Sequence, residues 1–288
     1  MRKTYGVAIP VYKAQETILP VLNSLKNSLY LRSVKLFVDD SYDYNYLKEI
    51  DFPFFIEISY NTNNLGYQKN WNLCLDWLKK FDWGIILHSD DQIKINIIEE
   101  KIINYKKNIS LIAFSKWQTK EEKVFSNLYD FIDSTGLYLD CSSIIFNMKF
   151  IAMYNIKYKE DILACDEYLY IDIFKRSGTI RVLKGDVLER RKSIHQAEYN
   201  DILNNEQKVI YSINQQISNI NNKRIQLLLK KKIFRTSVRG FFLKLIKQKK
   251  ISTTYLTYIL LNIYLILDFS LVKLILSDFK RALKLSNE

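Results

Sequence analysis

The sequence predicts an α/β protein in which a mainly parallel sheet is flanked by helices and followed by a helical appendage. The first observation is that short apolar runs without helical period alternate with segments that carry a helical stripe. The second is that polar residues gather directly after several of these runs, where open sheets of this kind bind ligands. The third is a change near residue 200, beyond which the pattern is helical and basic residues are in excess.

The N-terminal part is expected to contain four strands with helices between them. Residues 4–12 form an apolar run, and apolar positions at 18, 19, 22, 25 and 29 then predict a helix over 15–29. The same alternation assigns strands to 33–40, 54–61 and 83–88, and helices to 43–50 and 65–81. Strands that alternate with helices predict parallel pairing.

The next segments are less regular. We expect helices over 94–108 and 166–178, and strands over 111–117, 141–148 and from 179 into the basic residues near 190. Residues 119–138 show no pattern that assigns them. From about residue 200 the chain is expected to be helical throughout. We therefore divide it into a main domain, 1–200, with halves 1–93 and 94–200, and a tail, 201–288.

Composition limits the class of protein. Hydrophobic residues make up 48% of the chain and aromatic residues 14%, which excludes a largely disordered chain. The three cysteines have no CxxC spacing and the first residues contain no signal-peptide core, so a reduced, cytoplasmic setting is expected. Only two histidines are present, and neither pairs with a cysteine at ligand spacing, which argues against structural zinc.

The net charge of +12 is concentrated in the tail. Residues 1–220 contain 28 basic and 28 acidic residues, whereas residues 221–288 contain 15 basic and 3 acidic residues. The chain therefore consists of a neutral body with a basic appendage, and the charge does not indicate a nucleic-acid-binding body.

Two pairs of aspartates follow expected strands. Asp39 and Asp40 come after the second strand, and Ser89, Asp90 and Asp91 come after the fourth. Because carboxyl ends of parallel strands meet at one edge, these oxygens suit a hard divalent cation that carries a diphosphate. The alternative for the second pair is an N-cap of the helix that follows.

The stretches IPVYKAQETILPVLNSL, LFVDDSYD, NTNNLGYQKNWN and IILHSDD, in this order and spacing, resemble the nucleotide-sugar half of family 2 glycosyltransferases with the GT-A fold, of the bacterial surface-polysaccharide type. The resemblance covers roughly residues 4–195 and does not reach the tail. It implies a nucleotide-sugar half over 1–93, an acceptor half over 94–200, and transfer of a sugar from a nucleotide-diphospho-sugar.

The resemblance also implies roles for individual residues in donor binding. Tyr12 matches the residue that packs on the base, after Pro10, and Asp40, with Asp39 beside it, matches the acid that hydrogen-bonds the base. The family's loop and helix start that line the donor pocket correspond to Asn64, Gly66, Lys69 and Asn70. The alternatives are ordinary packing for Tyr12, a turn for Asp40, and a plain turn and cap for the loop.

The metal motif of the family corresponds to Ser89, Asp90 and Asp91, with one acid expected on the metal and the other on the ribose. Many relatives have an acid where His88 stands, and we interpret His88 as a packing residue beside the site. The resemblance implies Mn²⁺ or Mg²⁺ as cofactor, with His195 closing the metal or diphosphate site unless it is a surface histidine.

The catalytic base is implied within the stretch ACDEYLYIDIFKRSG, where Glu167 takes the position of the family's acid and Asp166 precedes it. Either can serve, and the alternative is that both complement the dipole of a helix. Arg190 and Arg191 suit a bidentate contact with phosphate, although a solvated charge run is an equal interpretation.

The tail begins with a basic amphipathic pattern over 221–250, which is typical of helices on an anionic membrane surface. The apolar run 255–267 is shorter than the ~20 residues that span a bilayer. It is expected to be interfacial, buried against the main domain, or a dimer contact. A nucleic-acid patch is a weaker alternative, because the aromatic residues lie among the leucines.

These observations lead to one hypothesis. The resemblance implies an inverting glycosyltransferase of the hexosyltransferase type with a UDP-linked donor. Together with the basic tail, it predicts extension of a glycan or lipid-linked glycan at the inner, cytoplasmic face of the cell membrane. Nucleic acid is not an expected partner, and a homo-oligomer is possible. The alternative from another class is a non-enzymatic nucleotide-binding or membrane scaffold protein on the same fold, with His88 marking a decayed metal site.

Overall fold

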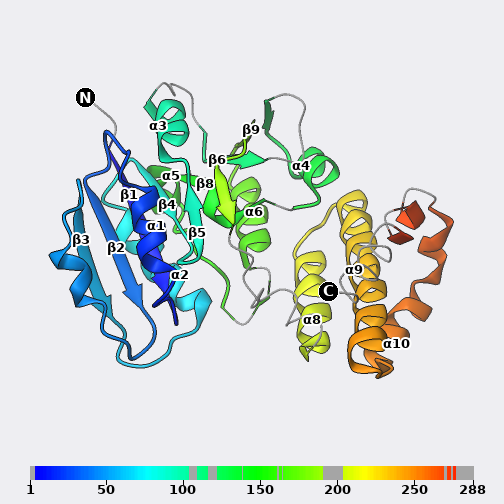
Figure 1. Ribbon diagram of the computed structural model, residues 1–288. Coiled ribbons are helices and arrows are strands. Elements are labelled where there is room, and N and C mark those ends of the chain that lie inside the picture. The colour runs from blue at the N-terminus through cyan, green and yellow to red at the C-terminus, as the bar shows by residue number, and fades with distance from the viewer. Residues whose placement is uncertain are drawn as a thin grey trace. The chain divides into compact units, whose positions relative to one another are not determined.

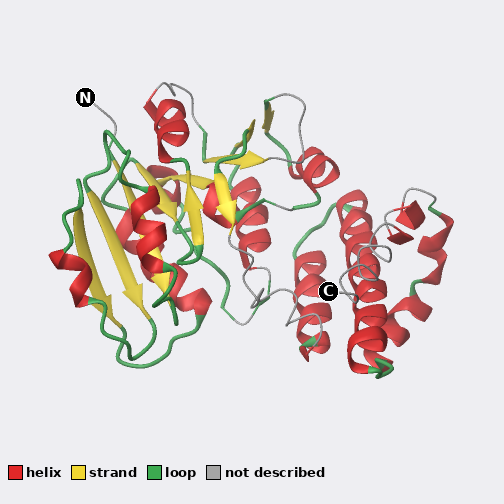
Figure 2. Cartoon of the chain, in the orientation of Figure 1, coloured by secondary structure: helices red, strands yellow, loops and turns green. Residues whose placement is uncertain are grey.

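The computed structural model describes residues 4–103, 109–115, 122–137, 139–160, 162–163, 165–190, 204–268, 271–273 and 275–276. The chain divides into two compact units. The α/β unit comprises Met1–Asp161 with Cys165–Ser193, and the helical unit comprises Ile162–Ala164 with Ile194–Glu288. Strands occur in the first unit, and the described residues of the second form helices and turns (Figure 2).

The α/β unit is built on an eight-stranded sheet of order β3-β2-β1-β4-β8-β6-β9-β7 (Figure 1). The strands are β1 (Tyr5–Val11), β2 (Ser33–Val38), β3 (Phe55–Tyr60), β4 (Trp83–Ile86), β6 (Leu111–Ser115), β7 (Lys123–Phe125), β8 (Ile144–Asn147) and β9 (Ile180–Lys184). Strands β1 to β4 are parallel, β8 is antiparallel to β4 and β6, β6 and β9 are parallel, and β7 is antiparallel to β9. The sheet is therefore mixed and mainly parallel, as predicted. A separate pair is formed by β5 (Asp91–Ile93) and β10 (Leu188–Arg190).

Helices and short helical turns flank this sheet. They are α1 (Ile18–Ser24), η1 (Asn45–Glu49), α2 (Tyr67–Leu78), α3 (Ile95–Ile103), α4 (Leu128–Thr135), η2 (Cys141–Ser143), α5 (Met148–Met153) and α6 (Cys165–Lys175). The segment 119–138, which the sequence left unassigned, contains β7 and α4. The Asn127 side chain caps α4 by accepting a hydrogen bond from the Asp130 N–H.

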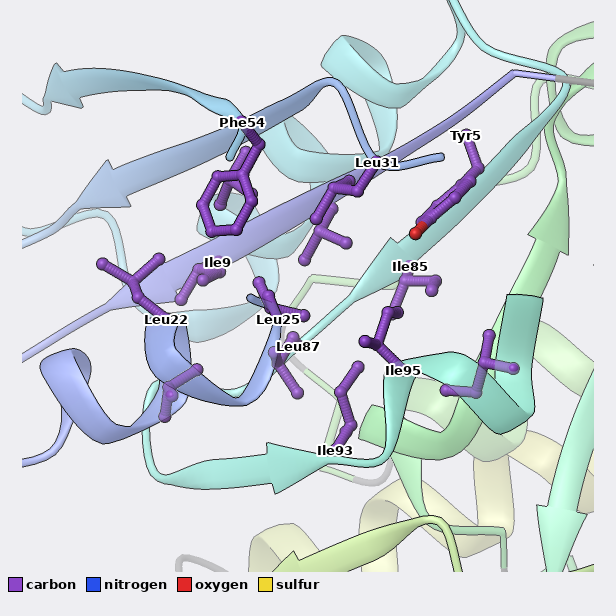
Figure 3. Packing of buried hydrophobic residues seen from close by; sticks show 14 of the residues in the cluster. Tyr5, Ile9, Leu22, Leu25, Leu31, Phe54, Ile85, Leu87, Ile93 and Ile95 are labelled. Carbon is purple, nitrogen blue, oxygen red and sulfur yellow. The ribbon is translucent and has the colours of Figure 1, made fainter. Parts of the chain in front are cut away.

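The main core explains why the first strands show no alternation of polar and apolar residues. Six of the seven residues of β1 are buried, because helices cover both faces of a parallel sheet. Figure 3 shows Leu22 of α1 and Leu25, which follows the helix as its C-cap, packing among side chains of β1, β4 and β5. This packing fixes the ends of the strands, where the polar residues lie.

The described residues of the helical unit form helices joined by short turns, which confirms the predicted helical appendage. The helices are α8 (Glu206–Ser218), α9 (Lys223–Leu243), η3 (Lys244–Gln248), which is a π-helical turn, α10 (Thr253–Leu261) and η4 (Ile263–Leu267). Asn222 and Ser252 begin new helices by accepting hydrogen bonds from backbone N–H groups in the first turn. A Cβ on Gly240 would lie 2.4 Å from the Tyr255 ring, so α9 and α10 approach closely. In the part of the chain that the structure describes, no helix combines the length and apolar character needed to cross a membrane.

Candidate functional site

Asp39 ties the ends of three segments together at the carboxyl edge of the sheet. Its backbone N–H donates to the Val11 carbonyl (2.8 Å), which joins the ends of β1 and β2. Its carboxylate accepts hydrogen bonds from the Asn61 side chain (2.8 Å) and from the N–H groups of Leu65 (2.8 Å) and Gly66 (3.0 Å). The side chain is only 5% exposed. Asp39 therefore positions the turn that precedes α2.

Asp40 and Tyr12 lie at the same edge and are more accessible. The Asp40 carboxylate accepts hydrogen bonds from the N–H groups of Lys13 (2.5 Å) and Tyr42 (2.9 Å), which is the turn expected as its alternative. The Tyr12 ring is 52% exposed, and the Lys13 ammonium lies 5.2 Å from its centroid. Tyr12 is thus no core residue, which argues against the ordinary packing expected as its alternative.

The turn before α2 is shaped by Asn64 and Gly66. Gly66 has φ +79°, a left-handed value that favours glycine, and its N–H also donates to the Asn64 carboxamide (3.0 Å). The Asn64 side chain donates in turn to the Asp39 carbonyl (3.1 Å). The first turn of α2 therefore begins next to Asp39, with backbone N–H groups at its start.

The remaining residues of the predicted donor pocket differ in exposure. Asn70 is 2% exposed and its amide donates to the Phe37 carbonyl (2.9 Å), so this side chain is used within the fold. Lys69 is exposed, with its ammonium 3.9 Å from the Glu160 carboxylate. Pro10 is partly buried in β1 and lies in register with Phe37.

A group of three potential metal ligands lies where the chain passes from β4 to β5. His88, Asp90 and Asp91 each offer a ligand atom, and these atoms lie within 4.8 Å of one another. The His88 Nδ1 is 3.8 Å from an oxygen of Asp91, which is 7% exposed. Ser89, within this segment, is partly buried. Helix α3 begins only at Ile95, so neither aspartate is its N-cap, and that alternative is wrong.

Besides its neighbours Asp90 and Asp91, His88 contacts the Trp71 ring and the Ser142 hydroxyl. Its ring stacks on Trp71 at 5.0 Å with an interplanar angle of 23°, and its backbone N–H donates to the Ser142 hydroxyl (3.0 Å). The Nε2 atom is buried and has no hydrogen-bond partner within the described chain. The packing expected for His88 is present, but the ring also belongs to the cluster of ligands. One imidazole with two carboxylates fits a Mn²⁺ site, and Mg²⁺ prefers oxygen ligands alone.

Strand β10 runs antiparallel to β5, which places Arg190 in register with Asp91. The backbone at Arg190 is therefore adjacent to the metal-ligand segment. Arg191 and His195, which were predicted to bind phosphate and metal, lie outside the described residues.

The two candidate bases occupy the first turn of α6, as their alternative role at a helix N-terminus also requires. The Cys141 thiol donates to the Asp166 carboxylate (3.3 Å), while Glu167 is 7% exposed. Burial, together with the charge and hydrogen bond of Asp166, raises the pKa of the Cys141 thiol, which stays a neutral donor. Cys141 precedes Ser142 in η2, so this turn connects Asp166 to His88.

Sequence reasoning missed Asn61, Trp71 and the η2 turn. Asn61 follows β3 at the same sheet edge as the aspartates, a signal that was present in the sequence. Trp71 and η2 meet His88 only through the tertiary fold, and their spacing along the chain gives no sign of it.

Comparisons with known proteins agree with this geometry. A family model described as "Glycosyl transferase family 2" matches residues 6–163. The structure resembles TarS 1–349 from S. aureus in complex with UDP-GlcNAc, with a TM-score of 0.63, 14% identity, and coverage of 89% of this chain and 79% of that chain. It also resembles the mannosyltransferase PcManGT from Pyrobaculum calidifontis in complex with GDP-Man and Mn²⁺, with a TM-score of 0.58, 11% identity, and coverage of 98% and 88%. The likeness to these glycosyltransferases confirms the expected GT-A fold. No curated protein sequence matches the chain.

Proposed function

Since the chain belongs to glycosyl transferase family 2, we propose that it transfers a hexose-type sugar, with inversion, from a UDP-linked donor to a hydroxyl of a glycan or lipid-linked glycan in cell-surface polysaccharide synthesis. The observation that carries this proposal is the group of His88, Asp90 and Asp91 at the sheet edge where parallel strands bind ligands. The nucleotide sugars in the complexes of TarS and PcManGT support a donor of this class.

The donor's base packs on Tyr12 and is hydrogen-bonded by Asp40. The exposed Tyr12 ring supports the first contact, and the accessible Asp40 carboxylate suits an imide N–H of uracil. Asp39 and Asn70 act indirectly: Asp39 fixes the turn at Leu65 and Gly66, and Asn70 ties α2 to the end of β2 through the Phe37 carbonyl. The diphosphate lies near the start of α2, with Ser89 and Lys69 available to it.

A metal ion, Mn²⁺ or Mg²⁺, would be held by Asp91 and Asp90, with His88 as a third ligand and His195 as a further one. When bound, the ion supplies positive charge that stabilises the departing nucleoside diphosphate. Arg190 and Arg191 add charge-assisted hydrogen bonds to the same phosphates.

The acceptor hydroxyl gives its proton to Asp166 or Glu167 while its oxygen bonds to the anomeric carbon. The bond from that carbon to the diphosphate oxygen breaks, and the leaving group takes the electron pair. Attack on the face opposite the leaving group inverts the anomeric configuration. The link from Asp166 through η2 to His88 supports Asp166 near the metal ligands.

The setting we propose is the inner, cytoplasmic face of the cell membrane, with the basic tail on the anionic lipid surface. Between residues 223 and 273 the chain has 12 basic residues and one acidic residue, which supports this attraction.

The test of the donor site is a calorimetric titration of UDP with and without Mn²⁺. We expect binding by the wild type in Mn²⁺, and its loss in Asp91→Asn or without the ion. Asp51→Asn, which removes an exposed acid outside the site, is the matched control and is expected to bind as the wild type does. Equal UDP binding by wild type and Asp91→Asn would contradict the metal role of Asp91.

A further inference from the structure

We infer that residues 260–267, at the junction of α10 and η4, form a docking surface for the interfacial region of an anionic lipid bilayer. We call these residues the 260–267 segment. The inference rests on the proposed membrane association of the tail and identifies the surface that makes it. It is independent of the chemistry of sugar transfer.

The basic helix α9 does not offer the free apolar face that its sequence suggests. Ile233 and Phe234 are fully buried, and Val238 is 9% exposed. Ile233 packs with residues of α8 and α10, and Phe234 and Val238 pack with Leu265 and Leu271. The middle of the apolar stripe of α9 is therefore used to build the helical unit, so these three side chains do not make the membrane contact.

The apolar residues that remain outside lie together a little further along the chain. Five side chains of the 260–267 segment are 51–83% exposed, namely Leu260, Leu261, Ile263, Tyr264 and Leu267. Between them, Leu265 is 4% exposed and packs with Phe234 and Val238. The segment is thus anchored by the buried Leu265 side chain, while the five side chains named above are exposed. Exposed apolar residues gathered in this way mark an interaction surface.

Charge identifies the occupant as an anionic surface. No charged residue occurs between 251 and 267, so the segment itself is apolar. The single acid between 223 and 273, Asp268, is paired with Lys231 at 2.5 Å, which leaves the basic excess of the unit uncompensated. Anionic lipids complement this charge, whereas a second copy of the same face would bring like charges together.

The length and composition of the 260–267 segment determine how deeply it enters the bilayer. An eight-residue apolar segment covers far less than the ~20 residues of a spanning helix. Leucine and isoleucine side chains enter the boundary between headgroups and acyl chains, and the hydroxyl of a tyrosine such as Tyr264 stays at the headgroup level. The segment therefore lies on the membrane and does not cross it.

The experiment is flotation of the full chain with vesicles of phosphatidylcholine and phosphatidylglycerol, and with phosphatidylcholine alone. The test variant is Leu261→Ser with Leu267→Ser, and the matched control is Tyr211→Ser with Leu227→Ser, which also removes two exposed apolar side chains of this unit. We expect the wild type and the control to float with the anionic vesicles, and the test variant to bind about tenfold more weakly.

The outcomes separate the possible explanations. Weaker vesicle binding with unchanged melting temperature and unchanged UDP titration supports the docking surface. Equal flotation of the test variant and the wild type overturns the assignment of this segment. A wild type that floats with neither vesicle overturns the membrane association itself, and UDP binding then shows separately whether the donor site stands. A wild-type dimer that the test variant splits in gel filtration overturns the inference in favour of a second copy.

Discussion

Two buried carboxylates in the α/β unit lie in opposite surroundings. Glu99 of α3 is 3% exposed, and hydrogen-bond donors from the N-terminal segment surround it. They are the hydroxyls of Tyr5 and Ser28 and the backbone N–H groups of Leu29 and Tyr30. Asp91 of β5 is 7% exposed and lies instead beside another acid, Asp90, and the imidazole of His88.

The difference separates a carboxylate whose neighbours are hydrogen-bond donors of the fold from one whose neighbours are potential metal ligands. Glu99 fixes the loop between α1 and β2 to α3, because its charge is compensated by donors of the chain itself. Asp90 and Asp91 lie close together beside His88, and a bound cation would offset the repulsion between their two charges. Burial alone therefore does not identify a functional acid, and the identity of its neighbours does.

The largest effect is expected from Asp91→Asn. Loss of the metal ligand proposed above should lower the rate of nucleoside diphosphate release from the donor sugar at least about 100-fold. The free energy of unfolding should change less than it does in Glu99→Gln, because the mutation also removes one of two neighbouring like charges. Initial rates in Mn²⁺ and urea unfolding measure the two effects. If Asp91→Asn lowered the free energy of unfolding and left the turnover rate unchanged, Asp91 would be a structural carboxylate as Glu99 is.

Glu99→Gln is expected to act on stability and not on chemistry. The amide replaces a charged acceptor and turns an NH₂ toward donors, which costs about 2–4 kcal/mol in the free energy of unfolding. The rate per folded molecule should remain that of the wild type. The matched control is Glu100→Gln, the neighbouring exposed acid on the same helix. A large loss of activity in folded Glu99→Gln would argue that both carboxylates serve the site.

The pH dependence of the same variant provides a second check. Burial raises the pKa of Glu99, but hydrogen bonds from Ser28, Tyr5 and the N–H groups of Leu29 and Tyr30 outweigh it and lower the pKa below 4.5. The stabilisation is therefore present above the unfolded pKa and is lost as the pH falls through the folded value. In urea titrations, the difference in the free energy of unfolding between the wild type and Glu99→Gln should become smaller as the pH is lowered from about 7 to about 3.

The sequence was sufficient for the fold where the pattern reflects burial on both faces of a strand. The run in β1 predicts a central parallel strand, yet the equally apolar β8 is antiparallel, because apolar content does not encode strand direction. The short β7 and α4 lack a period long enough to recognise. The apolar pattern of α9 fits a helix packed on its neighbours as well as one on a membrane, and only its tertiary contacts distinguish them.

At the candidate site, position at a strand end was the useful signal. It brought out Asp90 and Asp91 before any contact was known, because the topology of a parallel sheet gathers such residues. It did not bring out His88 as a potential ligand, since the turn after β4 and the stacking on Trp71 decide where the imidazole lies. The connection from His88 to Asp166 through η2 joins residues far apart in the sequence, so no local pattern carries it.

His88→Asp turns the group of His88, Asp90 and Asp91 into three carboxylates, in contrast to the single carboxylate of Glu99. With an imidazole among the ligands, we expect Mn²⁺ to support the reaction better than Mg²⁺. The added oxygen ligand should shift the ratio of rates in Mg²⁺ and Mn²⁺ toward Mg²⁺ by about tenfold. Rates measured in each ion give this ratio, and His88→Asn, which adds no charge, is the control. An unchanged ratio in His88→Asp would show that His88 is a packing residue only.

The smallest effect is expected from Tyr5→Phe, which removes one of the donors to Glu99 and keeps the ring in the core. The loss should be about 1–2 kcal/mol, since one hydrogen bond to a charged group is removed while the others remain. In the Glu99→Gln background, Tyr5→Phe should lower the free energy of unfolding by less than it does in the wild type. The reason is that Glu99→Gln has already weakened the hydrogen bond that Tyr5→Phe removes. Urea unfolding of the four proteins of this cycle measures the coupling. Additive losses would mean that Tyr5 stabilises the fold by packing, and that the donors around Glu99 do not act together in compensating its charge.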